Sequence, residues 1–126
     1  MENILDGVVA ISLEQAVAAP YCSRLLSDSG ARVIKVERPE GDFARYYDTV
    51  VHHNSAYFCW LNAGKESICI DLTDSKDLSL LKSMIESADI FIQNLKPGVT
   101  KKYSLDHTSN QCLNPCLLYT SDAADE

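Results

Sequence analysis

Four short apolar runs recur along the chain, and segments with helical periodicity separate them. The runs are GVVAIS at 7–12, RVIKVE at 32–37, SICIDL at 67–72 and DIFIQN at 89–94. Apolar runs of about four to eight residues, bounded by polar or turn residues, are typical of strands buried in a parallel sheet. The pattern therefore predicts a strand at each run.

A helix is predicted between the first two runs. Pro20 suits the first helical position, where its missing N–H costs nothing, and Gly30 suits the position just after the last turn. Cys22, Leu25 and Leu26 fall on one helical face, which we expect to pack against the sheet. The order strand, helix, strand calls for a right-handed crossover and parallel strands.

The remaining segments extend this pattern. Asp74 is placed to cap a second helix, and one face of that helix collects the apolar residues Leu78, Leu81, Ile85 and Ala88. Residues 43–62 show no clear periodicity of apolar positions, which predicts a long loop that leaves the sheet. Residues 101–115 are polar and predict a short helix followed by a loop. The sequence therefore predicts an α/β fold with a Rossmann-like open parallel sheet.

Composition narrows the classes of function. The formal net charge of −7 argues against a nucleic-acid binder, and no apolar run approaches the length of a membrane span. The acidic N-terminus lacks the basic region of a signal peptide, and the five cysteines show no C-x-x-C spacing. We therefore expect a cytoplasmic protein with reduced thiols and no membrane partner.

Ligands of open parallel sheets gather where the strands end. Arg38, Lys65 and Lys102 are candidates to hold phosphate groups there, and a solvated surface charge is the alternative for each. Gly64-Lys65 lacks the Ser or Thr that follows the lysine of a P-loop, and no G-x-G-x-x-G follows the first run. Further ligands with metal-site spacing do not accompany His52 and His53, so we predict no metal site.

Four motifs resemble, in order, those of the family III CoA-transferases. They are EQAVAAPYCSRLLSDSGARVIKVERPEGD at 14–42, SAYFCWLNAGKESICIDL at 55–72, ADIFIQNLKPGV at 88–99 and LNP at 113–115. The family includes formyl-CoA transferase, the carnitine and bile-acid CoA-transferases, and α-methylacyl-CoA racemase. The resemblance implies that residues 1–115 are the incomplete N-terminal part of the large domain of a bigger enzyme, whose subunits form an interlocked homodimer.

The resemblance also implies a CoA site. Ala16 and Ala18 match positions that line the CoA pocket, and the other matching positions are Arg38, Lys65, Asn94, Leu95 and Lys102. Val17 stands where formyl-CoA transferase has a glutamine. The motifs EQAVAAP and GDFAR resemble those of the subgroup that acts on short dicarboxylic acids. The implied substrates are an acyl-CoA and a free carboxylic acid, without a metal.

The family nucleophile is an aspartate that attacks the thioester, and the resemblance places it beyond Pro115. Asp28, Asp42, Asp48 and Asp71 do not match it, and Asp122 and Asp125 lie in the C-terminal segment considered below. We therefore predict no catalytic residue in this chain and no CoA transfer by it. A racemase that moves an α-proton and a non-catalytic nucleotide-binding or interaction module remain as alternatives.

The last eleven residues, CLLYTSDAADE at 116–126, match the translation of a transposon-end sequencing adapter. We therefore expect residues 116–126 not to be native and the natural protein to continue differently after Pro115. A frayed acidic C-terminus is the alternative.

Overall fold

One five-stranded sheet organises the computed structural model, which describes residues 2–121. The strands are β1 Val9–Leu13, β2 Arg32–Glu37, β3 Glu66–Cys69, β4 Ile90–Gln93 and β5 Leu118–Ser121. Their spatial order is β3-β2-β1-β4-β5, and every neighbouring pair is parallel. The predicted α/β class and parallel sheet are confirmed.

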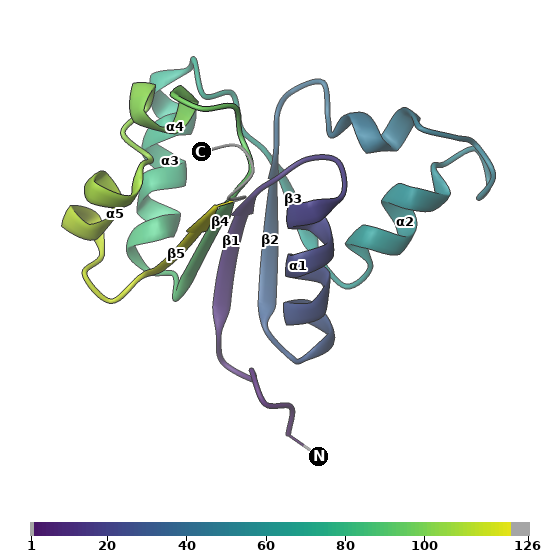
Figure 1. Ribbon diagram of the computed structural model, residues 1–126, viewed down its shortest axis with the longest axis horizontal. Helices are drawn as coiled ribbons and strands as arrows, with labels where there is room; N and C mark the ends of the chain where they lie inside the picture. Colours follow the sequence, from purple (N-terminus) through teal and green to yellow (C-terminus); the bar gives the residue numbers. More distant parts are fainter. Residues whose placement is uncertain (1, 122–126) are drawn as a thin grey trace.

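Helices cover both faces of the sheet (Figure 1). They are α1 Ala18–Asp28, the 3-10 helix η1 Phe43–Tyr46, α2 Ala56–Asn62, α3 Ser75–Glu86, α4 Val99–Lys102 and α5 His107–Leu113. Helix α1 contacts β1, β2 and β4, and α2 packs against α1 and η1, whereas α3 packs against α5 on the opposite face. Among the described residues, no helix combines the length and apolar character that crossing a membrane requires.

The larger core lies under α3 and α5. Because side chains alternate along a strand, Ile11, Leu13 and Val36 reach this face, where Leu81 and Phe91 are fully buried beside them. The opposite face has a smaller apolar cluster near the start of the strands, built on Ala10, Ala31 and Val33. Toward the strand ends, that second face becomes polar.

Helix α1 packs on this polar region through small residues. Its buried positions are Ala19, Pro20 and Ser23, whereas Cys22 and Leu25 are exposed. The expectation that Cys22 and Leu25 face the sheet is therefore wrong. The reason is the sheet beneath, where β1 and β2 present Ser12 and Lys35 instead of apolar side chains.

Three elements differ from the sequence prediction. Strand β3 begins at Glu66 and ends at Cys69, so residues 70–72 lie beyond it. The predicted loop at 43–62 contains η1 and α2, whose caps are supplied by Asp42 and Ser55. Residues 118–121 form β5, which pairs with β4. The predicted non-native origin of 116–126 is a separate question and stays a prediction.

Candidate functional site

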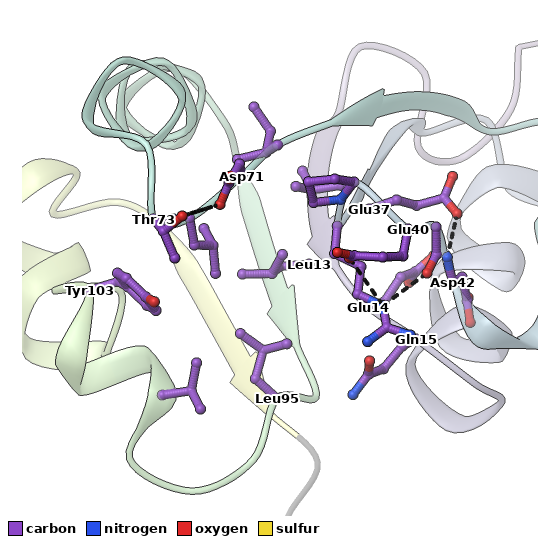
Figure 2. A pocket seen from close by; sticks show the side chains of 17 residues that line it. Leu13, Glu14, Gln15, Glu37, Glu40, Asp42, Asp71, Thr73, Leu95 and Tyr103 are labelled. Carbon is purple, nitrogen blue, oxygen red and sulfur yellow. Dashed lines mark hydrogen bonds and ion pairs between the residues drawn. The ribbon is translucent and has the colours of Figure 1, made fainter.

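A cavity of about 450 Å³ lies at the carboxyl edge of the sheet. Its walls are formed where four strands end, by 13–15 at and after β1, 36–42 at and after β2, 70–73 after β3 and Leu95 after β4, together with Val99 and Tyr103. Figure 2 shows Thr73 and Tyr103 on one side of this cavity and Glu40 and Asp42 on the other. The cavity is where an open parallel sheet is expected to bind its ligand.

Arg38 is the one cationic residue that the described part of the chain contributes to the lining of this cavity. Its Nε donates a hydrogen bond to the Gly41 carbonyl at 3.0 Å, and its guanidinium lies 5.2 Å from the centre of the Phe43 ring. Gly41 has a φ of +81°, a conformation that favours glycine. The turn thereby leaves Arg38 half-exposed and beside an acid, since its Nε lies 4.0 Å from Glu40.

Of two further predicted residues, one lines the cavity and the other lies beside it. Leu95 lines it directly. Asn94 does not line it but binds the backbone of Gln15, because its Oδ1 accepts from the Gln15 N–H at 2.9 Å and its Nδ2 donates to the Gln15 carbonyl at 2.8 Å. The side chain of Asn94 therefore shapes the loop after β1, where Ala16 follows Gln15.

The other predicted residues lie outside the cavity. Ala18 lines a second, smaller hollow of about 200 Å³ near the start of α1. Lys102 is exposed on α4, with its ammonium 5.2 Å from the centre of the Tyr103 ring. The Lys65 side chain is only 1% exposed and is fully engaged, as described next. The structure thus brings Arg38 and Leu95 together and leaves Lys65, Lys102 and Ala18 apart from them.

Lys65 belongs to a buried charge cluster of four side chains that sequence reasoning missed, Glu14, Lys35, Asp42 and Lys65. Lys65 Nζ lies 2.7 Å from Glu14 Oε1, and Lys35 Nζ lies 2.8 Å from Asp42 Oδ2 and 3.4 Å from Glu14 Oε1. Burial lowers the pKa of Lys65, while the nearby Glu14 carboxylate opposes that change. A lysine inside the otherwise apolar run RVIKVE was the available signal, because such a residue needs a buried partner.

Residues 70–73 were also missed as part of the site. The sequence pattern places them in the third strand or just after it, but β3 ends at Cys69, and Asp71 and Thr73 lie on the cavity wall. The Thr73 hydroxyl donates to Asp71 Oδ1 at 2.6 Å, and this hydrogen bond, with one from the Thr73 N–H, lowers the pKa of Asp71. An ionised Asp71 and the exposed Glu40 make this cavity acidic around Arg38.

Glu37 lines the cavity and fixes the turn after β2 through its hydrogen bonds. Its carboxylate accepts from Arg45 at 2.7 and 2.8 Å, from the Ser67 hydroxyl at 2.6 Å and from the Asp42 N–H at 2.9 Å. The Arg45 guanidinium also lies 3.9 Å from the centre of the Phe58 ring. Burial raises the pKa of Glu37, but the hydrogen bonds from Arg45, Ser67 and Asp42 outweigh it and lower the pKa to about 2.

This pKa makes stability depend on pH. The folded-state pKa of about 2 lies below the ordinary glutamate value of 4.5, so Glu37 stabilises the fold above pH 4.5 and loses this contribution as the pH falls toward 2. Allowing for the partial exposure of Arg45, the contribution is about 2 kcal/mol. Urea unfolding between pH 6 and about 2 should show wild type losing more stability than Glu37→Gln. Parallel pH profiles of the two proteins would contradict this assignment.

Comparison with known proteins agrees with the resemblance read from the motifs. The sequence profile of CoA-transferase family III matches residues 5–123. The chain is 36% identical over 119 residues to an acetyl-CoA:oxalate CoA-transferase of Acetobacter aceti, covering 94% of this chain and 31% of the relative. It is 37% identical over 122 residues to a succinyl-CoA:mesaconate CoA-transferase of Haloarcula hispanica, covering 93% of this chain and 31% of the relative.

A solved structure is similar along nearly the same span. The crystal structure of a CAIB/BAIF family protein from Brucella suis superposes with a TM-score of 0.89 at 37% identity, covering 96% of this chain and 33% of that protein. The chain spans about a third of the length of the curated relatives it matches. Because the family profile matches residues 5–123, nearly the whole chain, the chain belongs to CoA-transferase family III.

Proposed function

We propose that the protein to which this chain belongs moves CoA between an acyl-CoA thioester and a free carboxylic acid. The observation that carries the proposal is the family match over residues 5–123. The cavity at the carboxyl edge of the sheet supports it, because it offers Arg38 to a phosphate and the apolar side chains of Leu95 and Leu72 to the rest of a CoA molecule.

The reacting carboxylate is proposed to lie outside this chain. In the expected mechanism, an aspartate carboxylate attacks the thioester carbonyl, releasing CoA thiolate and forming a mixed anhydride. The thiolate then attacks the aspartyl carbonyl, which frees the donor acid and leaves an aspartyl-CoA thioester. The acceptor carboxylate attacks this thioester, and the same two steps run in reverse to give the new acyl-CoA and the free aspartate. Asp42 is a poor nucleophile because it is buried and bound to Lys35 and two backbone N–H groups. The 126-residue chain is therefore expected to transfer no CoA.

The acceptor and donor are proposed to include a short dicarboxylic acid. Relatives at 36 to 38% identity are named for oxalate, mesaconate, succinate and glutarate, all of which are dicarboxylic acids. Val17, just before α1, stands in place of a glutamine of formyl-CoA transferase, which argues against formyl or oxalyl transfer, so among these acids mesaconate, succinate and glutarate fit the proposal better than oxalate. An α-methylacyl-CoA racemase remains the second candidate, because racemases of this family are expected to bind CoA with the same part of the fold.

Two wider expectations belong to the same proposal. The complete protein is expected to be a cytoplasmic interlocked homodimer, and exposed apolar side chains on 43–62, such as Tyr46, Val50 and Trp60, support a covered surface there. Residues 116–126 are expected to derive from a sequencing adapter, so the natural chain would continue differently after Pro115.

The test begins with the source DNA. Sequencing past the Pro115 codon should give a longer reading frame, and the protein expressed from that whole frame is then incubated with an acyl-CoA and an isotopically labelled dicarboxylic acid. Label appearing in the acyl-CoA supports a transferase, whereas deuterium uptake at the α-carbon without label exchange supports the racemase. Two results would contradict the fragment proposal, a stop codon directly after Glu126 and measurable label exchange by the 126-residue chain itself.

A further inference from the structure

The loop between β1 and α1 contains a residue in an unfavourable conformation. Ala16 has a φ of +65°, in the left-handed region that an alanine rarely adopts because its Cβ crowds the backbone. Such a conformation persists only where surrounding contacts hold it. Here those contacts come from the segments that follow the two neighbouring strands, β2 and β4.

Asp42 holds Ala16 from the β2 side. Its Oδ1 accepts the Ala16 N–H at 3.0 Å, and the same oxygen accepts the Ala44 N–H at 2.9 Å. On the β4 side, Asn94 binds the N–H and carbonyl of Gln15. The peptide groups just before and at Ala16 are therefore fixed from two directions.

Asp42 is itself held firmly. It is only 2% exposed, its Oδ2 accepts from Lys35 Nζ at 2.8 Å, and its N–H donates to Glu37 Oε1 at 2.9 Å. Because water is excluded, these charged hydrogen bonds are stronger than they would be at the surface. Asp42 thus couples the buried charge cluster to the backbone of the β1–α1 loop.

The two segments that Asp42 joins are adjacent parts of one cavity wall. Glu14 and Gln15 line the cavity from the loop after β1, and residues 38–42 line it from the turn after β2 (Figure 2). Resting on the proposed function, we propose that Asp42 is a positioning residue for acyl-CoA binding, because its carboxylate fixes Ala16 in the left-handed conformation and so sets the shape of this wall.

The central variant is Asp42→Asn in the protein expressed from the whole reading frame. Asparagine has a single acceptor oxygen, so it cannot face both Lys35 and the Ala16 N–H. We expect the KM for acyl-CoA to rise about tenfold with kcat changed much less, since a displaced loop weakens contacts to CoA that are the same in the ground and transition states. Glu66→Gln, on the exposed edge strand and remote from the cavity, is the matched control and should leave KM unchanged.

Ala16→Gly tests whether the loop conformation is the cause. Glycine adopts positive φ at little cost, so it should partly replace the hold that Asp42 supplies. In the double variant we expect KM to return at least threefold toward wild type, with Ala16→Gly alone closing the double-mutant cycle. A role of Asp42 limited to folding predicts no such rescue at temperatures well below melting.

A measurement without ligand separates this inference from the proposed function. Hydrogen–deuterium exchange of the peptide containing residues 14–17 should quicken in Asp42→Asn relative to wild type, because the Ala16 N–H loses its acceptor. Unchanged exchange, a KM within twofold of wild type, or no rescue by Ala16→Gly would each overturn the positioning role. A wild-type protein that neither binds nor turns over acyl-CoA overturns the proposed function, and the exchange result then decides the role of Asp42 in the loop alone.

If Asp42→Asn does not fold, Ala16→Val provides the same test with the buried charges intact. The branched side chain opposes the left-handed conformation, so we expect a raised KM. An unchanged KM would overturn the inference.

Discussion

Replacing Glu14 with alanine should lower the free energy of unfolding by about 3 to 5 kcal/mol. The Glu14 side chain is fully buried and is the acid closest to Lys65, at 2.7 Å, while it also lies 3.4 Å from Lys35. Removing it leaves the buried Lys65 ammonium without a carboxylate and leaves Lys35 with only one, that of Asp42. Uncompensated buried charge is among the most destabilising changes a domain can suffer.

Urea unfolding of the 126-residue chain measures this loss, or thermal melting of the whole protein if the shorter chain does not fold alone. The matched control is Glu66→Ala, whose ion pair with Arg32 is more than half exposed on both sides and is worth under about 1 kcal/mol. Adding Lys65→Met to Glu14→Ala should recover part of the stability, because it removes the orphaned charge. Similar losses for Glu14→Ala and Glu66→Ala would show that the cluster contributes no more than a surface pair.

The sheet was predictable because its signal is local. The runs at 32–37 and 89–94 contain β2 and β4, and the run at 7–12 covers all of β1 except Leu13, because a strand buried on both faces is mostly apolar over its own length. The short helix α2 was not predicted, because its sequence AYFCWLN has no apolar period and leaves Tyr57 and Trp60 exposed. It is held by its Ser55 cap and by packing on α1, and packing depends on distant residues.

The site was predictable only in part, for a related reason. Arg38 directly follows a predicted strand and was therefore expected at the carboxyl edge of the sheet, where it lines the cavity wall. Lys65 looked equally available to a phosphate in the sequence, yet its charge is matched by Glu14, 51 residues away along the chain. Whether a cation is free or paired is a property of the tertiary structure, and no spacing rule reveals it.

Arg38→Ala should weaken CoA binding about ten- to hundredfold. Arg38 is the one cation lining the cavity among the described residues, and a charge-assisted hydrogen bond to a phosphate is worth about 1.5 to 3 kcal/mol. The loss should be large because Glu40 and Asp71, which also line the cavity, repel the CoA phosphate once Arg38 is removed. Glu40→Gln should therefore act in the opposite direction and tighten binding about two- to threefold.

Calorimetric titration of CoA into the protein from the whole reading frame measures these changes, and repeating it at raised salt should narrow the gap between wild type and Arg38→Ala. Lys76→Ala, which removes an exposed cation from α3, is the control and should bind like wild type. Lys102→Ala should lose less than Arg38→Ala, because its ammonium lies beside Tyr103 and outside the cavity lining. Equal losses for Arg38→Ala and Lys102→Ala would mean that the phosphates lie across α4, whereas no loss for Arg38→Ala would remove this cavity from the CoA site.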